Sequence, residues 1–144
     1  MRKNVWTVVL LIIVAMILSG CTIESEAEVV DGPLTGAQGV ITRVDWNGSG
    51  TGRMSVTSPD GEVCGGRYFT GSKLGKCEPV FGFDMWAKYF GSQFDPWMMQ
   101  RGAGILTGDS GRVIMVEYFV TITNVGYGLG EDNYGNIYRF VIRP

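Results

Sequence analysis

Three stretches of this chain share one layout, and that layout constrains the fold more than any other feature. Each begins with Gly-x-Gly, passes through a turn that holds another glycine, and ends in an apolar or aromatic run: GTGRMSVTSPDGEVCGGRYF, GAGILTGDSGRVIMVEYF and GYGLGEDNYGNIYRFVI. The turn glycines, Gly61, Gly111 and Gly135, supply the positive φ of a tight turn between antiparallel strands. We therefore predict a mainly β fold: a small antiparallel barrel or curled sheet of repeated hairpins, with one or two short helices and one disulfide.

Apolar residues on the predicted strands indicate how deeply each strand is buried. The segment 113–122 carries large apolar side chains on both faces, which predicts a central strand, whereas the segment 137–142 is more one-sided. The paired glycines at the start of each repeat would allow a bend or a close approach of two backbones.

The repeated layout resembles MORN repeats, whose units read Gly-x-Gly, a turn glycine, then Tyr-x-Gly-x-aromatic. The first copy follows this pattern through Gly50, Gly52, Gly61, Gly66 and Tyr68. It departs from the pattern at Cys64, which stands where the tyrosine is usual. The second and third copies lack the later glycine, at Val116 and Phe140. The resemblance supports a meander of antiparallel strands.

The N-terminus, MRKNVWTVVLLIIVAMILSGC, has the layout of an export signal. Two basic residues precede the apolar stretch 5–18, which is shorter than the roughly 20 residues that span a bilayer. An uncleaved membrane anchor is the alternative.

The signal ends in Leu18-Ser19-Gly20-Cys21, which resembles the lipobox of bacterial lipoproteins. The resemblance implies that diacylglycerol is attached to the Cys21 thiol, that the chain is cut before Cys21, and that the new amine is often acylated. It also implies an outer-membrane destination, because Thr22 follows where the family's inner-membrane proteins have Asp.

These features predict three regions: a lipoprotein signal peptide over 1–20, an acidic flexible tether over 21–36, and a single β-rich domain over 37–144. The tether is predicted because TIESEAEVVDGPLTG has four acidic residues, few large apolar groups and a Gly-Pro breaker. An added edge strand around 28–30 is the alternative.

The net charge of the chain limits the classes of partner that it can bind. The chain holds 12 basic and 14 acidic side chains, and loss of Arg2 and Lys3 with the signal gives the remaining chain a net charge of −4. Nucleic acid is not an expected partner, because binding it requires many Lys and Arg side chains to neutralise phosphates. Adhesion to anionic lipid surfaces by charge is not expected either.

Two cysteines remain once Cys21 is assigned to the lipid. An even pair in an exported protein, here Cys64 and Cys77, predicts a disulfide. Neither a cofactor nor a metal is expected, since the chain has no histidine and no second cysteine pair.

An aromatic insertion separates the first two repeats. Within 81–101, Asp84 is predicted to cap a short helix that ends at Gly91, and Asp95-Pro96 to begin a second helix that Gly102 ends. Its large side chains either belong to the core or form a recognition surface. The candidate surface comprises Trp86, Tyr89, Phe90, Trp97, Met98 and Arg101.

Catalytic signatures are few. The absence of histidine excludes His-based triads and imidazole bases. Asp84, Asp95 and Glu117 are the acids that a carboxylate-dependent hydrolase would use. Glu131-Asp132-Asn133 lacks the alternating acids of an EF-hand loop, so a solvated turn is predicted there.

Together these patterns predict a non-enzymatic, lipid-anchored protein of the bacterial cell envelope with a binding or structural role. It would sit in the outer membrane facing the periplasm, held by its N-terminal lipid, with an envelope protein or peptidoglycan as partner. Two alternatives belong to other classes: an envelope inhibitor or exclusion lipoprotein (lysozyme inhibition, phage or plasmid exclusion), and an Asp/Glu-dependent cell-wall hydrolase.

Overall fold

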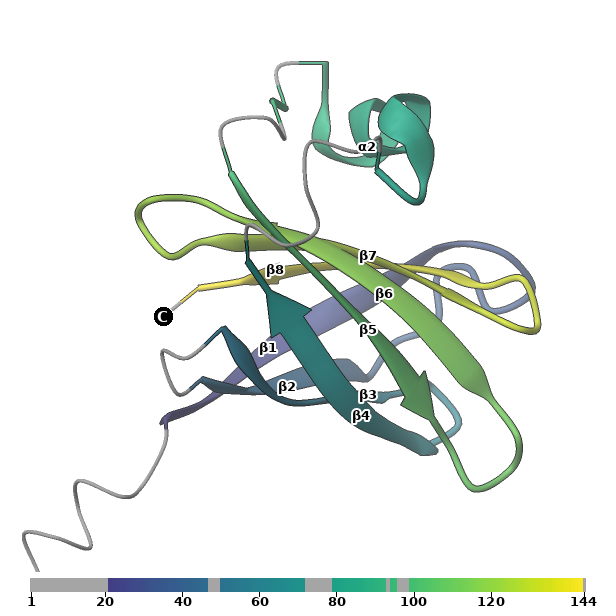
Figure 1. Cartoon of the computed structure of the whole chain (residues 1–144). Helices are drawn as coiled ribbons and strands as arrows, with labels where there is room; N and C mark the ends of the chain where they lie inside the picture. Colours follow the sequence, from purple (N-terminus) through teal and green to yellow (C-terminus); the bar gives the residue numbers. More distant parts are fainter. Residues whose placement is uncertain (1–20, 47–49, 72–78, 93, 96–98, 144) are drawn as a thin grey trace, which may run out of the picture.

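The computed structural model describes residues 21–46, 50–71, 79–92, 94–95 and 99–143. Eight antiparallel strands form a closed barrel in sequence order, and within the described residues one helix lies between the fourth and fifth strands (Figure 1). The elements are β1 (Cys21–Asp31), β2 (Val40–Trp46), β3 (Thr51–Thr57), β4 (Val63–Thr70), α2 (Gly82–Phe90), β5 (Gln100–Thr107), β6 (Val113–Val120), β7 (Gly126–Asp132) and β8 (Ile137–Ile142). The predicted small antiparallel barrel is confirmed.

The three repeated stretches form the hairpins β3–β4, β5–β6 and β7–β8. Their turn glycines have positive φ, 86° at Gly61, 89° at Gly111 and 83° at Gly135. Each hairpin therefore turns where the repeat places its glycine, as predicted.

One glycine of each Gly-x-Gly faces the barrel interior and makes room for an aromatic ring from the neighbouring strand. Gly128 is paired with Phe140, and a Cβ added to Gly128 would lie 1.9 Å from the Phe140 ring. Gly102 is paired with Tyr118, where an added Cβ would lie 2.0 Å from Cζ of the ring. Because no side chain fits at such distances, the Gly-x-Gly motif here is a packing requirement of the barrel core.

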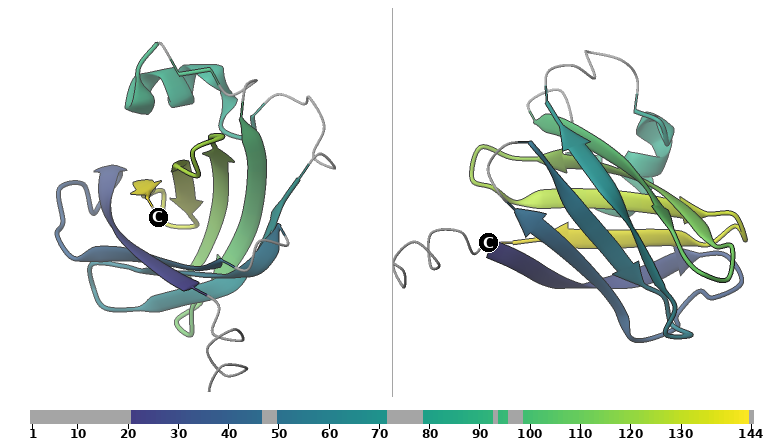
Figure 2. Two further views of the ribbon diagram at one scale, coloured as in Figure 1. Left: turned by 90° about the vertical axis from the view of Figure 1, so that its left-hand side faces the viewer. Right: turned by 60° about the horizontal axis from the view of Figure 1, so that its bottom comes forward.

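Strand β1 corrects the predicted boundary between tether and domain. Residues 21–31, expected to be flexible, pair with β2 on one side and with β8 on the other, and so close the barrel (Figure 2). The acidic composition is misleading because the acids alternate: Glu24, Glu26 and Glu28 are exposed, whereas Val29 is buried. The barrel therefore begins at Cys21, not at residue 37.

The disulfide prediction is wrong. Cys64 is a free cysteine with no exposed surface. It lies near the start of β4 with its side chain among the core residues, whereas the connection that contains Cys77 leaves β4 at its other end, after Thr70. Cys77 itself lies outside the described residues.

Helix α2 lies on the outside of the barrel. Trp86 packs with Phe119 of β6 and Leu129 of β7 in a second apolar cluster, separate from the barrel interior. Figure 2 shows the helix on the outer side of the sheet. The helix ends at Phe90 and is capped by Gly91, whose φ of 92° fits the predicted terminus. Asp84 lies in the first turn, not at the cap, because the helix begins earlier, at Gly82. The described part of the chain contains no helix long and apolar enough to cross a membrane.

The helix also explains the two-sided pattern of 113–122. In β6 alternate residues face the barrel interior, while Glu117 and Phe119 on the other face are buried beneath α2. The strand ends at Val120, and Ile122 is 96% exposed in the following turn, so the predicted strand was two residues too long. Gly102, expected to end a second helix, lies in β5. Pro96, the expected first residue of that helix, is outside the described residues.

Candidate functional site

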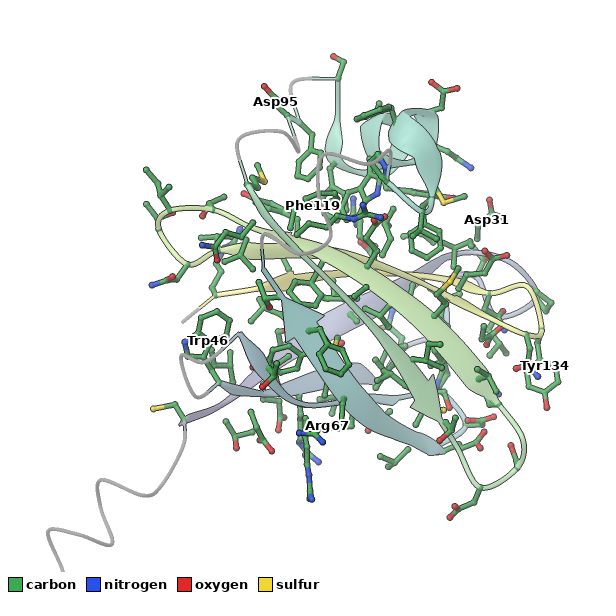
Figure 3. The ribbon with its side chains drawn as sticks, in the orientation of Figure 1. Asp31, Trp46, Arg67, Asp95, Phe119 and Tyr134 are labelled. Atoms are coloured by element: carbon green, nitrogen blue, oxygen red, sulfur yellow. The ribbon has the colours of Figure 1, made fainter. Side chains whose placement is uncertain are left out.

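The two ends of the barrel differ in chemistry. We call the end where β1 begins and β8 stops the mouth, and the end with the turns at Gly61, Gly111 and Gly135 the base. Trp46 lies at the mouth and Tyr134 at the base (Figure 3). Because both ends are built by the same strands, the difference between them comes from the residues that face inward.

The base is sealed by a charged network around Arg112. The side chain of Arg112 is 7% exposed, and its Nη2 lies 2.8 Å from Asp60 Oδ2 and its Nε 3.3 Å from Glu62 Oε2. Tyr138 accepts from Arg112 at 3.3 Å and donates its hydroxyl to Asp132 at 2.8 Å. The buried charges are thus paired, as burial requires.

The network sets the protonation of its members. Burial disfavours the charged form of Asp132, but hydrogen bonds from Asn136 and Tyr138 outweigh it and lower the pKa of Asp132. Burial, reinforced by the negative charge of Glu62, raises the pKa of the Cys64 thiol. The base therefore holds an ionised carboxylate and a neutral thiol.

The mouth contains a cavity of about 80 Å³ with mostly apolar walls. Seven strands contribute to it, and its lining comprises Ile23, Val44, Trp46, Met54, Tyr68, Tyr118, Val120, Asn124, Gly126 and Ile142. Glycine at position 126 leaves one wall open, because the nearest atom to an added Cβ would be Ile142 Cβ at 3.5 Å. The cavity is thus a concave apolar site at a barrel mouth, a common position for ligand binding.

The two tyrosine hydroxyls of the cavity are engaged by the barrel. Tyr68 donates to the carbonyl oxygen of Asp45 at 2.9 Å, and the Tyr118 hydroxyl lies 2.5 Å from Thr70 Oγ1. Burial raises the pKa of Tyr118, so this phenol stays neutral. Because these groups already have partners, an apolar occupant would leave neither hydroxyl unsatisfied.

The rim of the mouth carries exposed apolar groups and the predicted lipidation residue. Cys21 is exposed, opens β1 and is paired with Trp46, one of the cavity residues. Ile23 also lines the cavity, and Ile122 projects from the β6–β7 turn at the same end. The residue expected to bear the lipid thus stands directly beside the cavity.

The candidate partner surface on the aromatic insertion is largely packed against the barrel. Trp86 is 1% exposed and stacks on Phe90 and Phe94, with ring centroids 5.3 Å and 5.1 Å away. Tyr89 and Phe90 are half-buried, and the Tyr89 hydroxyl donates to Asp31 at 3.1 Å. Trp97 and Met98 lie outside the described residues.

Arg101 and Glu117, predicted in different roles, form one buried ion pair. Arg101 Nη2 lies 2.6 Å from Glu117 Oε1, and the two side chains are 11% and 1% exposed. Glu117 also accepts from the Trp86 indole at 3.1 Å and from the backbone N–H of Val80 at 3.0 Å. These bonds fasten the insertion to the wall of the barrel.

The three candidate acids do not share a site. Glu117 is buried and hydrogen-bonded to the fold, whereas Asp84 and Asp95 are exposed on the insertion. The solvated turn predicted over Glu131–Asn133 is wrong for Asp132, which is a buried residue of β7 and belongs to the base network. The Asn133 side chain accepts from Val113 N at 2.9 Å. Among the described residues no group of three or more Cys, Asp or Glu is placed to hold a metal ion.

The fold and site define a class: a closed eight-stranded antiparallel barrel with a polar base, an apolar mouth and one helix-covered wall. No protein-family model matches the chain, and no curated protein or solved structure is significantly similar to it. The mouth cavity was not predicted from the sequence. The available signal is the alternation of apolar residues in β2, β6 and β8, which indicates an apolar barrel interior.

Proposed function

We propose that this chain is a lipid-anchored protein of the bacterial envelope, outer membrane in type, which binds an apolar group at the mouth of its barrel without catalysing a reaction. The observation that carries the proposal is the position of Cys21, at the rim of an apolar cavity. The lipobox supports acylation of Cys21, and two or three acyl chains would give a stable anchor.

An acyl anchor on Cys21 would orient the barrel. Since β1 begins at Cys21 itself, no spacer separates the lipid from the mouth. The mouth, with exposed Ile122 and half-buried Trp46, would then face the bilayer, and the charged base would face the periplasm. Partly exposed Trp is favoured at membrane interfaces, which fits this orientation.

The cavity selects the kind of ligand. An engineered apolar cavity of about 150 Å³ holds benzene, so one of 80 Å³ suits a slimmer group. The end of a single alkyl chain has the right width and needs no hydrogen bonds. We propose that the mouth takes the end of such a chain, from a fatty acid or another single-chain lipid.

Lipid anchoring is tested by Cys21→Ala in the producing bacterium. The parent should incorporate labelled palmitate and sediment with membranes, and the variant should do neither. Equal labelling of both proteins would refute the lipoprotein assignment.

Ligand binding is tested separately with residues 21–144, which contain all eight strands, and a fluorescent fatty acid as probe. Gly126→Leu places a side chain in the cavity and should weaken probe binding at least about tenfold, a loss of about 1.4 kcal/mol. Gly65→Leu is the matched control, because Gly65 is on the outer wall with no atom within 4 Å of an added Cβ. Equal binding by the parent and Gly126→Leu would exclude the mouth as the site.

The inhibitor, exclusion and hydrolase alternatives stay predictions from the sequence.

A further inference from the structure

Two arginines stand side by side on the outer wall of the barrel. Arg53 of β3 and Arg67 of β4 are directly opposite one another in the strand register, and both are exposed. Arg67 projects away from the wall (Figure 3). Like charges at directly opposed positions destabilise a sheet, so this pair works against folding unless something else requires it.

Neither arginine has an acidic partner in the described part of the chain. By contrast, Arg43, Arg101, Arg112 and Arg139 each form an ion pair with a carboxylate. In a chain with 14 acidic residues, these two guanidinium groups are left facing solvent together.

The pair lines a groove of about 840 Å³ on the outside of β2, β3 and β4. Small residues form its floor, among them Ser55 and Gly65, and an added Cβ at Gly65 would meet no atom within 4 Å. Asp45 also lines the groove, but its carboxylate accepts from the Thr22 hydroxyl at 2.8 Å. The groove therefore offers open space beside two unpaired cations.

We propose that this groove binds a phosphate group through Arg53 and Arg67. A guanidinium group presents a planar fork of donors that matches phosphate oxygens, and two forks on neighbouring strands can hold one phosphate from both sides. The bound dianion or monoanion would also relieve the repulsion within the pair. The proposal stands whether or not Cys21 is acylated and does not depend on the mouth cavity.

The phosphate has two possible sources, a phospholipid headgroup and a soluble phosphate. Thr22 lines the groove and directly follows Cys21, so an anchored barrel would hold the groove near the membrane surface. A headgroup would then be within reach, and the experiment separates the two sources.

The test uses residues 21–144 carrying Cys21→Ser, so that no lipid contributes to binding. One arm measures co-sedimentation with vesicles of phosphatidylglycerol or of phosphatidylcholine. The other arm measures binding of glycerol phosphate by calorimetry. Binding to phosphatidylglycerol vesicles that weakens as salt is added supports the headgroup, and binding of glycerol phosphate alone supports a soluble source.

Arg53→Gln and Arg67→Gln should each weaken binding at least about tenfold. Arg143→Gln removes the same charge from an exposed position outside the groove and should change binding less than about twofold. Each groove variant should melt at the parent's temperature or above, because removal of one arginine relieves repulsion. Gly65→Leu should also block binding, whereas Gly126→Leu, which fills the mouth, should not.

Absence of binding in both arms overturns the proposal. An equal loss of binding in Arg143→Gln and in the groove variants overturns it as well, because it would show that only net charge matters.

Discussion

Trp86 donates its indole N–H to Glu117 across the interface between α2 and the barrel, with Nε1 and Oε2 3.1 Å apart. The bond is buried, and Glu117 holds Arg101 on its other oxygen. One carboxylate thus joins three parts of the chain: the helix, the start of β5 and the middle of β6. The insertion is therefore held to the wall by polar contacts as well as by its aromatic cluster.

Glu117→Ala should destabilise the protein by about 3–5 kcal/mol, because it breaks the buried ion pair with Arg101. Trp86→Phe, which keeps a ring in the cluster but removes the donor, should cost about 1.5–3 kcal/mol. Urea unfolding followed by tryptophan fluorescence for Glu117→Ala, and by circular dichroism for both variants, measures these changes.

Glu26→Ala serves as the control for the Glu117 variant. Glu26 is exposed on the outer face of β1, so its loss should change stability by less than about 0.5 kcal/mol. If Glu117→Ala unfolds at the same urea concentration as Glu26→Ala, the proposed anchoring of the insertion is wrong.

Gly128→Ala should destabilise the barrel by about 1–3 kcal/mol, the usual range for overpacking a core. The added methyl would lie 1.9 Å from the Phe140 ring, which has to move. Gly65→Ala, on the open outer wall, should leave the urea midpoint nearly unchanged. The double variant Gly128→Ala/Phe140→Leu should recover part of the loss, and failure to recover any would show that the ring is not the cause.

The repeated hairpins could be predicted from sequence because their signals are local. A turn glycine acts through its own φ, and three turns with the same spacing reinforce one another. The direction in which the Gly-x-Gly residues face could be assigned only from the register of the paired strands. Gly128 and Phe140 are close only because β7 and β8 align them across the hairpin.

The wrong predictions arose where amino-acid composition suggests one structure and the positions of the residues along a strand favour another. The segment 21–31 is acidic enough to suggest a tether, yet its acids occupy alternate positions and leave the other face free to close the barrel. Cys64 and Cys77 look like an even pair in sequence, but β4 directs Cys64 into the core at the base, where its thiol is free. Pairing rules for cysteines do not include strand direction.

The mouth cavity could not be predicted residue by residue. Its lining is ordinary core material, with no carboxylate, basic side chain or cysteine to mark it. Only closure of β1 against β8 gathers such residues from seven strands at one end. Arg53 and Arg67 were visible in the sequence, but their apposition is a property of the β3–β4 register.

Cys64 should carry a free thiol in the native protein and react only when the barrel opens. Its burial and raised pKa both suppress the thiolate that alkylating reagents require. Iodoacetamide without reductant should therefore leave the Cys64 peptide unmodified in buffer and modify it in 6 M guanidinium, as read by mass spectrometry. Modification that appears only after reduction would restore the disulfide hypothesis.

Acid should weaken the base of the barrel through Asp132. Its pKa is lowered in the folded protein, because hydrogen bonds from Asn136 and Tyr138 outweigh the effect of burial. The carboxylate therefore contributes stability that is fully present above the unfolded pKa of about 3.9 and is lost as the pH falls through the lower folded value.

Asp132→Asn should be less stable than the parent at pH 7 but should lose less free energy of unfolding between pH 5 and pH 2. Asp109→Asn, at an exposed residue of the β5–β6 turn, is the matched control for the loss of one carboxylate. Urea unfolding at several pH values measures the slopes, and identical slopes in all three proteins would show that Asp132 does not couple protonation to folding.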